Sequence, residues 1–249
     1  MASISTTAPL AVKPGGSTNL VVKGGNLVGV SHLWTSFTAQ TELAPGVKDN
    51  GKNAAECTWK VTLAADAAVG VYAIRVATPG GTTALKLIAV DDLPSVVQAG
   101  DNTSRAKAQA LTLPAAVDGT IGALSKRLFK FSAAKDQTIS FEVLARRLGS
   151  PLDPMLRLLD MNGRELAYSD DVPGLHGDSR LHYKFSVAGE YFVEVRDMTW
   201  QGGGGHFYRL RAGDFPCISV PYPLGVKRGT TATISFAGSS TEGISPVKL

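Results

Sequence analysis

The amino-acid sequence predicts an all-β chain that folds into tandem β-sandwiches. Polar and apolar residues alternate in short runs, which is the pattern of antiparallel strands with one buried face. Turn residues separate these runs, and the chain contains 27 glycines and 13 prolines. Few long apolar runs have the period of a helix, and such a composition is typical of all-β proteins with many turns.

The composition excludes several classes of protein. The chain has 249 residues, of which 44% are hydrophobic and 18% charged, so it is globular and long enough for one large or two ordinary domains. Its formal net charge is +4, and its lysines and arginines are scattered. A nucleic-acid-binding protein concentrates these residues on one face, so no nucleic acid partner is expected. No stretch approaches about 18 consecutive apolar residues, so no membrane span is expected.

The first predicted domain covers residues 1–93. Gly70-Val71-Tyr72 begins one strand, and Pro79-Gly80 makes the turn that follows it. This order of a Gly-x-Tyr strand, a Pro-Gly turn and a last apolar strand is similar to the immunoglobulin-like (Ig-like) IPT/TIG fold. The alternating apolar residues of its expected strands are Leu20 and Val22, Cys57, Trp59, Val61 and Leu63, Tyr72, Ile74 and Val76, and finally Leu85, Leu87 and Ala89.

A polar segment with Pro94 and Gly100 separates two apolar patterns and leads into the second predicted domain, residues 94–214. Residues 155–159 form a strand, which ends at Asn162-Gly163. That pair supplies the positive φ angles that a tight hairpin turn requires. The return strand, residues 164–168, stops before an acidic loop.

Two further strands complete the pattern. Gly189-Glu190-Tyr191 resembles the tyrosine corner of β-sandwiches, in which the tyrosine hydroxyl hydrogen-bonds nearby backbone. Because side chains alternate along a strand, we expect one set to face the core and the other to point away from it. The first set is Leu181, Tyr183, Phe185, Tyr191, Val193 and Val195, and the second includes Phe192, Glu194 and Arg196.

Several motifs of this second domain occur together. They are Leu-Gly-Ser-Pro-Leu-Asp-Pro at residues 148–154, Asp-x-x-Gly at 160–163, the pair Asp170-Asp171, and Gly-x-Tyr-x-Val-x-Val at 189–195. As a set they resemble the bacterial pre-peptidase C-terminal (PPC) domain. The resemblance implies a jelly-roll-like β-sandwich without catalytic activity, found beside a catalytic domain in secreted or cell-surface proteins. The start of the chain lacks the basic and apolar regions of a signal peptide, so the resemblance also implies a signal removed before Met1.

One departure from the family concerns a linker calcium site. The family places an acidic residue and an asparagine in the linker and an aspartate ahead of the aromatic strand. Here Asp101 and Asn102 remain, but Gln98 stands at an acidic position and Arg127 precedes Phe129. A cation cannot coordinate calcium and repels it, so the resemblance does not extend to this site.

Residues 215–249 are predicted to be the opening strands of a further Ig-like unit. Residues 229–239 align with residues 16–26, with glycines matched near both ends, so we interpret the segment as an internal repeat. A strand pair alone is marginally stable in water. We therefore expect residues 216–238 to pack on a neighbouring domain or on another chain, which would allow self-association through the C-terminal strands.

The acidic loops are the best candidate for a metal site. Calcium binds six to eight oxygen ligands, and clustered carboxylates can supply them. The predicted calcium ligands are Asp170, Asp171 and Asp178, within a set that also includes Asp153 and Asp160. Aspartates are equally common in turns, where they hydrogen-bond their own backbone, and this alternative stays open.

No enzymatic activity is expected, since the sequence has no nucleophile elbow, phosphate loop or zinc-binding helix. Trp59 is expected in the core. Trp200 precedes a glycine run and lies at a loop tip, where it either contacts a ligand or partner or covers the end of the sandwich. Cys57 and Cys217 either bridge distant parts of the chain or are separate buried thiols.

The sequence therefore predicts a non-catalytic extracellular or cell-surface segment of a larger secreted bacterial protein. It would act as a spacer or attachment scaffold, with other domains of the same polypeptide as its partners. The alternative is a module that binds polysaccharide or fibrous protein and delivers an attached hydrolase, with loops carrying the recognition.

Overall fold

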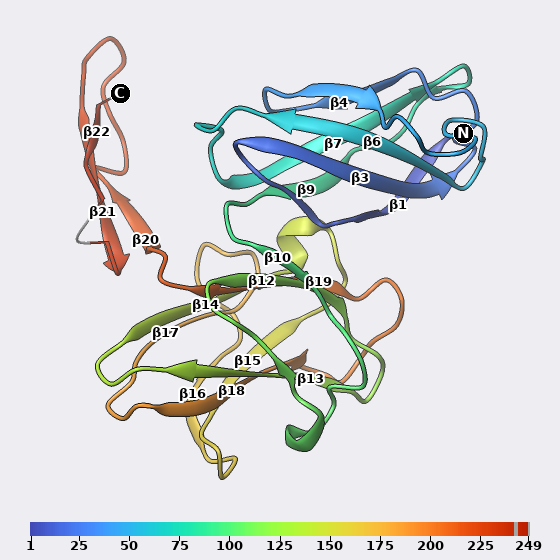
Figure 1. The fold of residues 1–249 in the computed structure, drawn as a ribbon. Coiled ribbons are helices and arrows are strands. Elements are labelled where there is room, and N and C mark those ends of the chain that lie inside the picture. The colour runs from blue at the N-terminus through green and yellow to red at the C-terminus, as the bar shows by residue number, and fades with distance from the viewer. Residues whose placement is uncertain (242–243, 249) are drawn as a thin grey trace. The chain divides into compact units, whose positions relative to one another are not determined.

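The computed structural model describes residues 1–241 and 244–248 and confirms the all-β prediction (Figure 1). The chain forms two compact units, one of residues 1–96 and 147–150 and the other of residues 97–146 and 151–249. Helical structure in the described residues is limited to two 3₁₀ turns, Arg105–Lys107 and Arg146–Leu148. No helix in the described part of the chain is long and apolar enough to cross a membrane.

The first unit is built from two sheets. One has the strand order β1-β3-β6-β5, and the other has the order β2-β9-β7-β4, with β8 beside β7. The strands of the first sheet are β1 (Ser3–Ala8), β3 (Gly16–Gly25), β6 (Glu56–Leu63) and β5 (Gln40–Leu43). Those of the second are β2 (Ala11–Val12), β9 (Lys86–Val90), β7 (Gly70–Thr78), β4 (His32–Thr35) and β8 (Gly81–Thr82).

Both sheets contribute to one core, which makes the first unit a β-sandwich. Leu20 and Trp59 come from the first sheet, Ile74 and Ile88 from the second, and all four are buried in a single cluster. The core position of Trp59 is confirmed. The Tyr72 hydroxyl donates a hydrogen bond to the Ala68 carbonyl (3.0 Å), which anchors the start of β7. The closer likeness to the IPT/TIG fold stays a prediction.

The side chains of β9 that enter the core are not the ones that the sequence pattern predicts. Ile88 and Val90 enter the core, whereas Leu85 lies before β9 and is 52% exposed. The segment Leu87-Ile88-Ala89-Val90 is apolar throughout, so alternation could not assign its faces. The register between β7 and β9 determines which side chains face the core, because Ile88 lies opposite Tyr72 on β7.

The second unit is also a two-layer sandwich (Figure 1). One sheet has the order β10-β12-β19-β14-β17 and the other the order β11-β13-β18-β15-β16. The strands of the first are β10 (Ser95–Val97), β12 (Ala115–Thr120), β19 (Phe207–Gly213), β14 (Thr138–Leu144) and β17 (Arg180–Lys184). Those of the second are β11 (Gln109–Ala110), β13 (Lys126–Ala133), β18 (Gly189–Asp197), β15 (Pro154–Leu159) and β16 (Glu165–Ser169).

Aromatic side chains join the two layers of this unit. Phe131 on β13 contacts Phe141 on β14, with ring centroids 5.1 Å apart, and Phe185 packs on Tyr191 at 4.5 Å. Such tilted aromatic pairs stabilise a core beyond the area they bury. The Tyr191 hydroxyl donates to the Val187 carbonyl (2.6 Å), so the predicted tyrosine corner is confirmed.

The β15–β16 hairpin uses a different turn from the one predicted. Gly163 has a φ of 87°, but Asn162 does not adopt a positive φ. The Gly163 amide donates to the Asp160 carbonyl, and the Asp160 amide donates to the Arg164 carbonyl, both at 2.9 Å. The connection is therefore a type I turn closed by a glycine bulge, which needs one positive φ rather than two.

The outer face of the second sheet is not solvent-exposed as a simple alternation implies. Phe192 and Glu194 do point away from the core, yet they are 3% and 1% exposed. Phe192 packs with Leu128, Leu159 and Ala108, because the segment after β10 crosses this face. The sheet therefore has side chains buried on both faces.

The C-terminal strands β20 (Cys217–Tyr222), β21 (Thr233–Ser239) and β22 (Val247–Lys248) form a small third sheet. The β20–β21 pair repeats the β1–β3 pair at an offset of 214 residues. The register of β1 on β3 shifts between Ile4 and Thr6, and that of β20 on β21 shifts at the equivalent point, between Ile218 and Val220.

Backbone geometry fixes this offset. Gly15 and Gly229 have φ values of 74° and 77°, and Asn26 and Ser240 have φ values of 57° and 53°. The internal repeat is therefore present, but Gly229 matches Gly15 rather than Gly16 as the sequence comparison suggested. The assignment of residues 215–249 to a further Ig-like unit, and the boundaries at 93/94 and 214/215, stay predictions.

The repeated segment is less buried than its counterpart. Leu10 and Val12 are 6% and 0% exposed in the first unit, whereas the equivalent Leu224 and Val226 are 80% and 48% exposed. Val12 belongs to β2, which pairs with β9. Within the described residues, the third sheet has only β20, β21 and β22, so these apolar side chains face solvent.

Both cysteines are free and buried. The alternative of separate thiols is confirmed, and no bridge joins them. Burial raises the pKa of both the Cys57 and the Cys217 thiol, so neither is a reactive thiolate at neutral pH.

Candidate functional site

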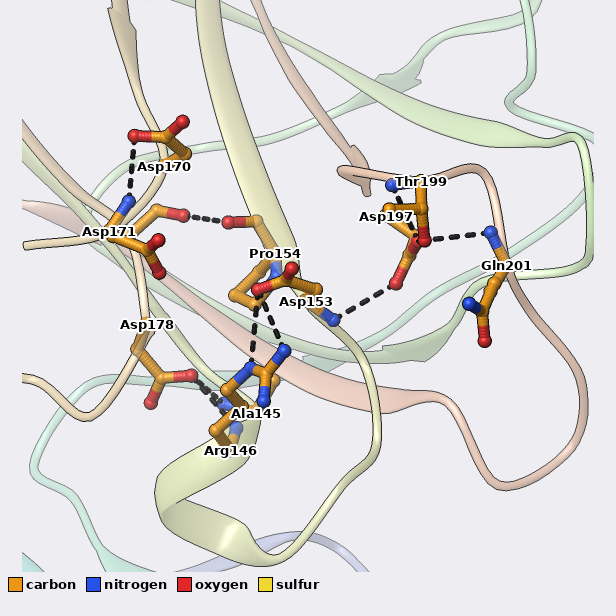
Figure 2. Close-up of polar contacts among 11 residues, drawn as sticks. Ala145, Arg146, Asp153, Pro154, Asp170, Asp171, Asp178, Asp197, Thr199 and Gln201 are labelled. Atoms are coloured by element: carbon orange, nitrogen blue, oxygen red, sulfur yellow. Dashed lines mark hydrogen bonds and ion pairs between the residues drawn. The ribbon is translucent and has the colours of Figure 1, made fainter.

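Asp170 and Asp171 follow β16 and begin the acidic loop of the second unit (Figure 2). The Tyr168 hydroxyl and the Asp171 amide both donate hydrogen bonds to the Asp170 carboxylate. These bonds, that from Tyr168 first, hold the pKa of Asp170 below its ordinary value. Asp170 therefore remains ionised, but two of its acceptor positions are occupied.

Asp178 lies at the other end of the loop and is fully buried. Its Oδ1 accepts hydrogen bonds from the amides of Ala145 (3.0 Å) and Arg146 (2.8 Å), as Figure 2 shows. Both donors lie just after β14, more than 30 residues away in sequence. Asp178 thus fixes the loop to the end of a strand, which is a structural use of a carboxylate.

A cation already occupies part of this acidic end. The Arg146 guanidinium pairs with Asp153 at 2.9 Å. The Arg146 side chain also lies close to the Gly177 backbone. A Cβ atom added at Gly177 would lie 2.8 Å from Arg146 Cδ and 3.3 Å from Asp171 Oδ1. Gly177 also has a φ of 83°, so both the lack of space and the backbone conformation favour glycine at this position. Arg146 therefore compensates part of the negative charge at this end.

Asp197 is a further carboxylate of this end with several hydrogen bonds, and the sequence analysis does not single it out. Its Oδ2 accepts from the Asp153 amide, and its Oδ1 accepts from the amides of Thr199 and Gln201 and from the Thr199 hydroxyl, each at 2.9 Å. Burial alone raises the pKa of this carboxyl, but the hydrogen bonds outweigh it and leave the pKa below its ordinary value. Asp197-x-Thr199 is a recognisable turn signal, which could have identified it.

The structure therefore brings Asp153 and Asp197 together and shows Asp170 and Asp178 in backbone-capping contacts. Among residues 1–241 and 244–248, no group of three or more histidine, cysteine, aspartate and glutamate side chains is arranged to hold a metal ion. Calcium binding by Asp170, Asp171 and Asp178 stays a prediction, and the capping alternative describes the contacts of Asp170 and Asp178.

Trp200 lies in the loop after β18 with an unusual backbone. Its φ is 62°, a left-handed conformation that is costly for a bulky residue. Its amide donates to the Asp197 carbonyl (3.2 Å), and its carbonyl accepts from the Leu124 amide (2.9 Å), so both sides of the peptide are fixed. The Arg196 guanidinium lies 4.5 Å from the ring centroid, and the residue stays 40% exposed.

Two other exposed side chains lie near the arginine that contacts Trp200. Tyr168 and Met198 are 44% and 42% exposed, and the Tyr168 hydroxyl lies 3.9 Å from the Met198 sulfur. Arg196 donates to the Met198 carbonyl (3.1 Å) while it stacks on Trp200. We call Tyr168, Arg196, Met198 and Trp200 the aromatic platform. An exposed aromatic ring held in place beside hydrogen-bonding groups can stack on a flat ligand such as a sugar ring.

The linker residues make contacts within the protein. Asp101 pairs with Lys107 at 2.7 Å, and this bond lowers the pKa of Asp101. Gln98 Oε1 accepts from the Tyr208 hydroxyl (2.9 Å), and Arg127 donates to the Thr120 carbonyl (3.1 Å). The departure of Gln98 and Arg127 from the family pattern thus coincides with structural roles for both.

One serine–histidine pair needs separate consideration. Ser140 Oγ lies 3.1 Å from Nδ1 of His182, but the same hydroxyl donates to the Phe215 carbonyl at 2.8 Å. His182 must then donate to Ser140, which is the reverse of the proton transfer that activates a serine nucleophile. Ser140 is also fully buried. The pair therefore joins strands rather than forming a nucleophile and base.

Comparison with known proteins gives one sequence relative. No family model matches the chain. A stretch of 68 residues is 40% identical to a probable subtilase-type serine protease of Deinococcus radiodurans. The match covers 27% of this chain and 9% of that protease, so it spans less than a tenth of the relative.

Several solved structures are similar to the chain at low identity. The pre-peptidase C-terminal domain of a Bacillus anthracis collagenase is 20% identical with a TM-score of 0.34, over 42% of this chain and 93% of that domain. The lysozyme inhibitor PliG of Aeromonas hydrophila is 11% identical with a TM-score of 0.35, over 48% of this chain and 97% of that chain. SGBP-B of a mixed-linkage glucan utilization locus of Bacteroides ovatus, solved with a heptasaccharide, is 10% identical with a TM-score of 0.28, over 84% and 75%. With TM-scores below 0.5, these likenesses assign no function.

Proposed function

We propose that the chain is a non-catalytic accessory segment of a larger secreted bacterial protein, where it spaces or attaches other domains. The observation that supports this is the short match to the subtilase-type protease. Subtilisin-type catalysis is carried by an α/β fold. The described residues here form strands and two 3₁₀ turns, so the 68 matching residues correspond to a part of the protease outside such a catalytic domain.

Activity-based labelling tests the accessory role directly. The purified chain is treated with a fluorophosphonate probe and, separately, with fluorescent casein, with subtilisin as the positive control. We expect neither labelling nor cleavage, because Ser140 is buried and donates its proton to a carbonyl. Labelling that disappears in Ser140→Ala would overturn the proposal. The matched control is Ser132→Ala, an exposed serine of β13.

The aromatic platform supports a second candidate function, the binding of a polysaccharide or fibrous protein. Trp200 holds a costly backbone conformation and keeps its ring partly exposed, and strain of this kind is concentrated at functional sites. Retention on insoluble polysaccharides and on collagen measures this. We expect Trp200→Ala to reduce retention and Trp34→Ala, which removes a similarly exposed tryptophan of β4, to leave it unchanged. No retention on any matrix would favour the spacer role alone.

A further inference from the structure

A hollow of about 330 Å³ opens on the outer face of the β11-β13-β18-β15-β16 sheet. Its sheet residues are Lys126 and Leu128 from β13, Arg157 and Leu159 from β15, and Glu194 from β18. The register places these side chains on one face, because Leu128 and Arg157 both lie opposite Glu194. The hollow is of the size that holds a single sugar ring or a short side chain.

A buried carboxylate organises the charges of this hollow. Glu194 is 1% exposed, and its two oxygens accept from Lys126 Nζ (2.8 Å) and Arg157 Nη1 (3.2 Å). A buried carboxylate is stable only with such partners. One carboxylate fixes two cations, and the side chains of both remain about one-third exposed. Arg157 also binds Glu165 through Nε at 2.6 Å.

A third cation is fixed at the rim. Arg105 donates to the Met161 carbonyl at 2.9 Å, which joins the segment before β11 to the β15–β16 turn. Its guanidinium lies against Gly163, where a Cβ atom would be 2.8 Å from Nη1 and 2.9 Å from Cζ. Gly163 thus provides both the turn conformation and the room for Arg105. Three cations and one carboxylate line the hollow, which leaves its lining positively charged.

The remaining lining is mainly polar. Thr103, Ser104 and Asn162 supply hydroxyl and amide groups, whereas Leu128 and Leu159 also line the hollow but are only 1% and 4% exposed. Sugar rings present hydroxyls at their edge and carbon–hydrogen bonds on their faces. A peptide is a less suitable ligand, because a peptide that binds by strand addition needs a free sheet edge. The hollow offers no such edge, since its strands β13, β18 and β15 each pair on both sides.

We propose that this hollow binds a carboxylate-bearing sugar, such as a uronic acid unit of an acidic polysaccharide. The carboxylate lies on Lys126 and Arg105, and the hydroxyls bond to the amide and hydroxyl groups of the lining. Lysine has three donors and Arg105 has further guanidinium donors beyond its bond to Met161. The proposal concerns the second unit alone, so its failure would leave the accessory role untouched.

Calorimetric titration of the whole chain at low ionic strength tests the site. The probes are sodium glucuronate, methyl glucoside as the neutral sugar, and N-acetylglycine as a carboxylate without a sugar. We expect glucuronate to bind most tightly. Lys126→Met should weaken glucuronate binding at least about tenfold, the effect of losing one charge-assisted hydrogen bond. Lys130→Met is the matched control, because Lys130 makes a similar pair with Glu190 (2.9 Å) on the same two strands but does not line the hollow.

A second variant keeps the test valid if Lys126→Met fails to fold, since that substitution removes one of the two cations that pair with the buried Glu194. Arg105→Gln removes an exposed cation from the rim and should also weaken glucuronate binding. Arg164→Gln, at the β15–β16 turn that Arg105 contacts, should not, because Arg164 does not line the hollow. The proposal is overturned if glucuronate does not bind or binds no better than methyl glucoside. It is likewise overturned if N-acetylglycine binds as tightly, or if folded Lys126→Met and Arg105→Gln keep the wild-type affinity.

Discussion

The carboxylate of Asp197 gives the sharpest test of how the second unit is held together. In Asp197→Asn the amide oxygen can still accept from Thr199 and Gln201, but the NH₂ group must then face the Asp153 amide. Two donors then meet, and one buried N–H is left unpaired. Such a loss costs about 1–3 kcal/mol. At about 3 °C per kcal/mol for a unit of this size, we expect the melting temperature to fall by about 3–9 °C.

The pH dependence of the same variant has a defined sign. The pKa of Asp197 is lower in the folded state than the unfolded value of about 3.9. Its stabilisation is therefore present above about pH 4 and is lost as the pH falls through the folded pKa. The stability gap between wild type and Asp197→Asn, measured by urea unfolding, should narrow below pH 4. Asp214→Asn, at an exposed position, is the control. A gap under about 0.5 kcal/mol at pH 7, or one that does not narrow in acid, would refute this account.

Four other predictions follow from the contacts described. Tyr191→Phe removes the 2.6 Å bond to Val187 and should cost about 1 kcal/mol in urea unfolding; an unchanged midpoint would contradict the tyrosine corner. Cys57 and Cys217 should react with a thiol reagent only after denaturation, and reduction should not change electrophoretic mobility. Calcium added to the chelated chain separates the two interpretations of the acidic loops: a rise of several degrees in the melting temperature is expected if Asp170, Asp171 and Asp178 bind the metal, and an unchanged melting temperature if the carboxylates only make contacts such as those of Asp178 with the Ala145 amide and of Asp153 with Arg146. Light scattering should show concentration-dependent association that Leu224→Asp abolishes, and a monomer at high concentration would exclude self-association.

Local sequence patterns predicted much of the architecture. Gly189-Glu190-Tyr191 identified a corner that the Tyr191 hydroxyl forms as expected, and the alternation around Trp59 placed that residue in the core. Patterns of this kind are readable because one buried face and one exposed face impose a period of two on the side chains.

Alternation assigns Phe192 and Glu194 to the correct face of their strand, but it does not show that this face is covered. The segment at Ala108 and the cations Lys126 and Arg157 cover it. A period of two cannot reveal a long-range crossing of the chain. For this reason the hollow around Glu194 could not be predicted, whereas the acidic loops and Trp200 were visible as turn and loop residues.

Single residues also decided some details. The turn at Gly163 needed one positive φ where the Asn-Gly pair suggested two, and the repeat was offset by one residue because adjacent glycines, Gly15 and Gly16, both fit the pattern. Backbone conformation distinguishes such neighbours, and residue type alone does not.

The β20–β21 pair has a consequence for the order in which the first unit folds. It keeps the bulge, the left-handed glycine and the close approach of Gly238 to the Cys217 carbonyl, as Gly24 approaches Ser3, although its apolar side chains lack the cover that Leu10 and Val12 have. These backbone features are therefore specified by about two dozen consecutive residues. Residues 3–26 are synthesised before the rest of the first unit, so the β1–β3 ribbon can assemble during translation and serve as the template on which β6 docks.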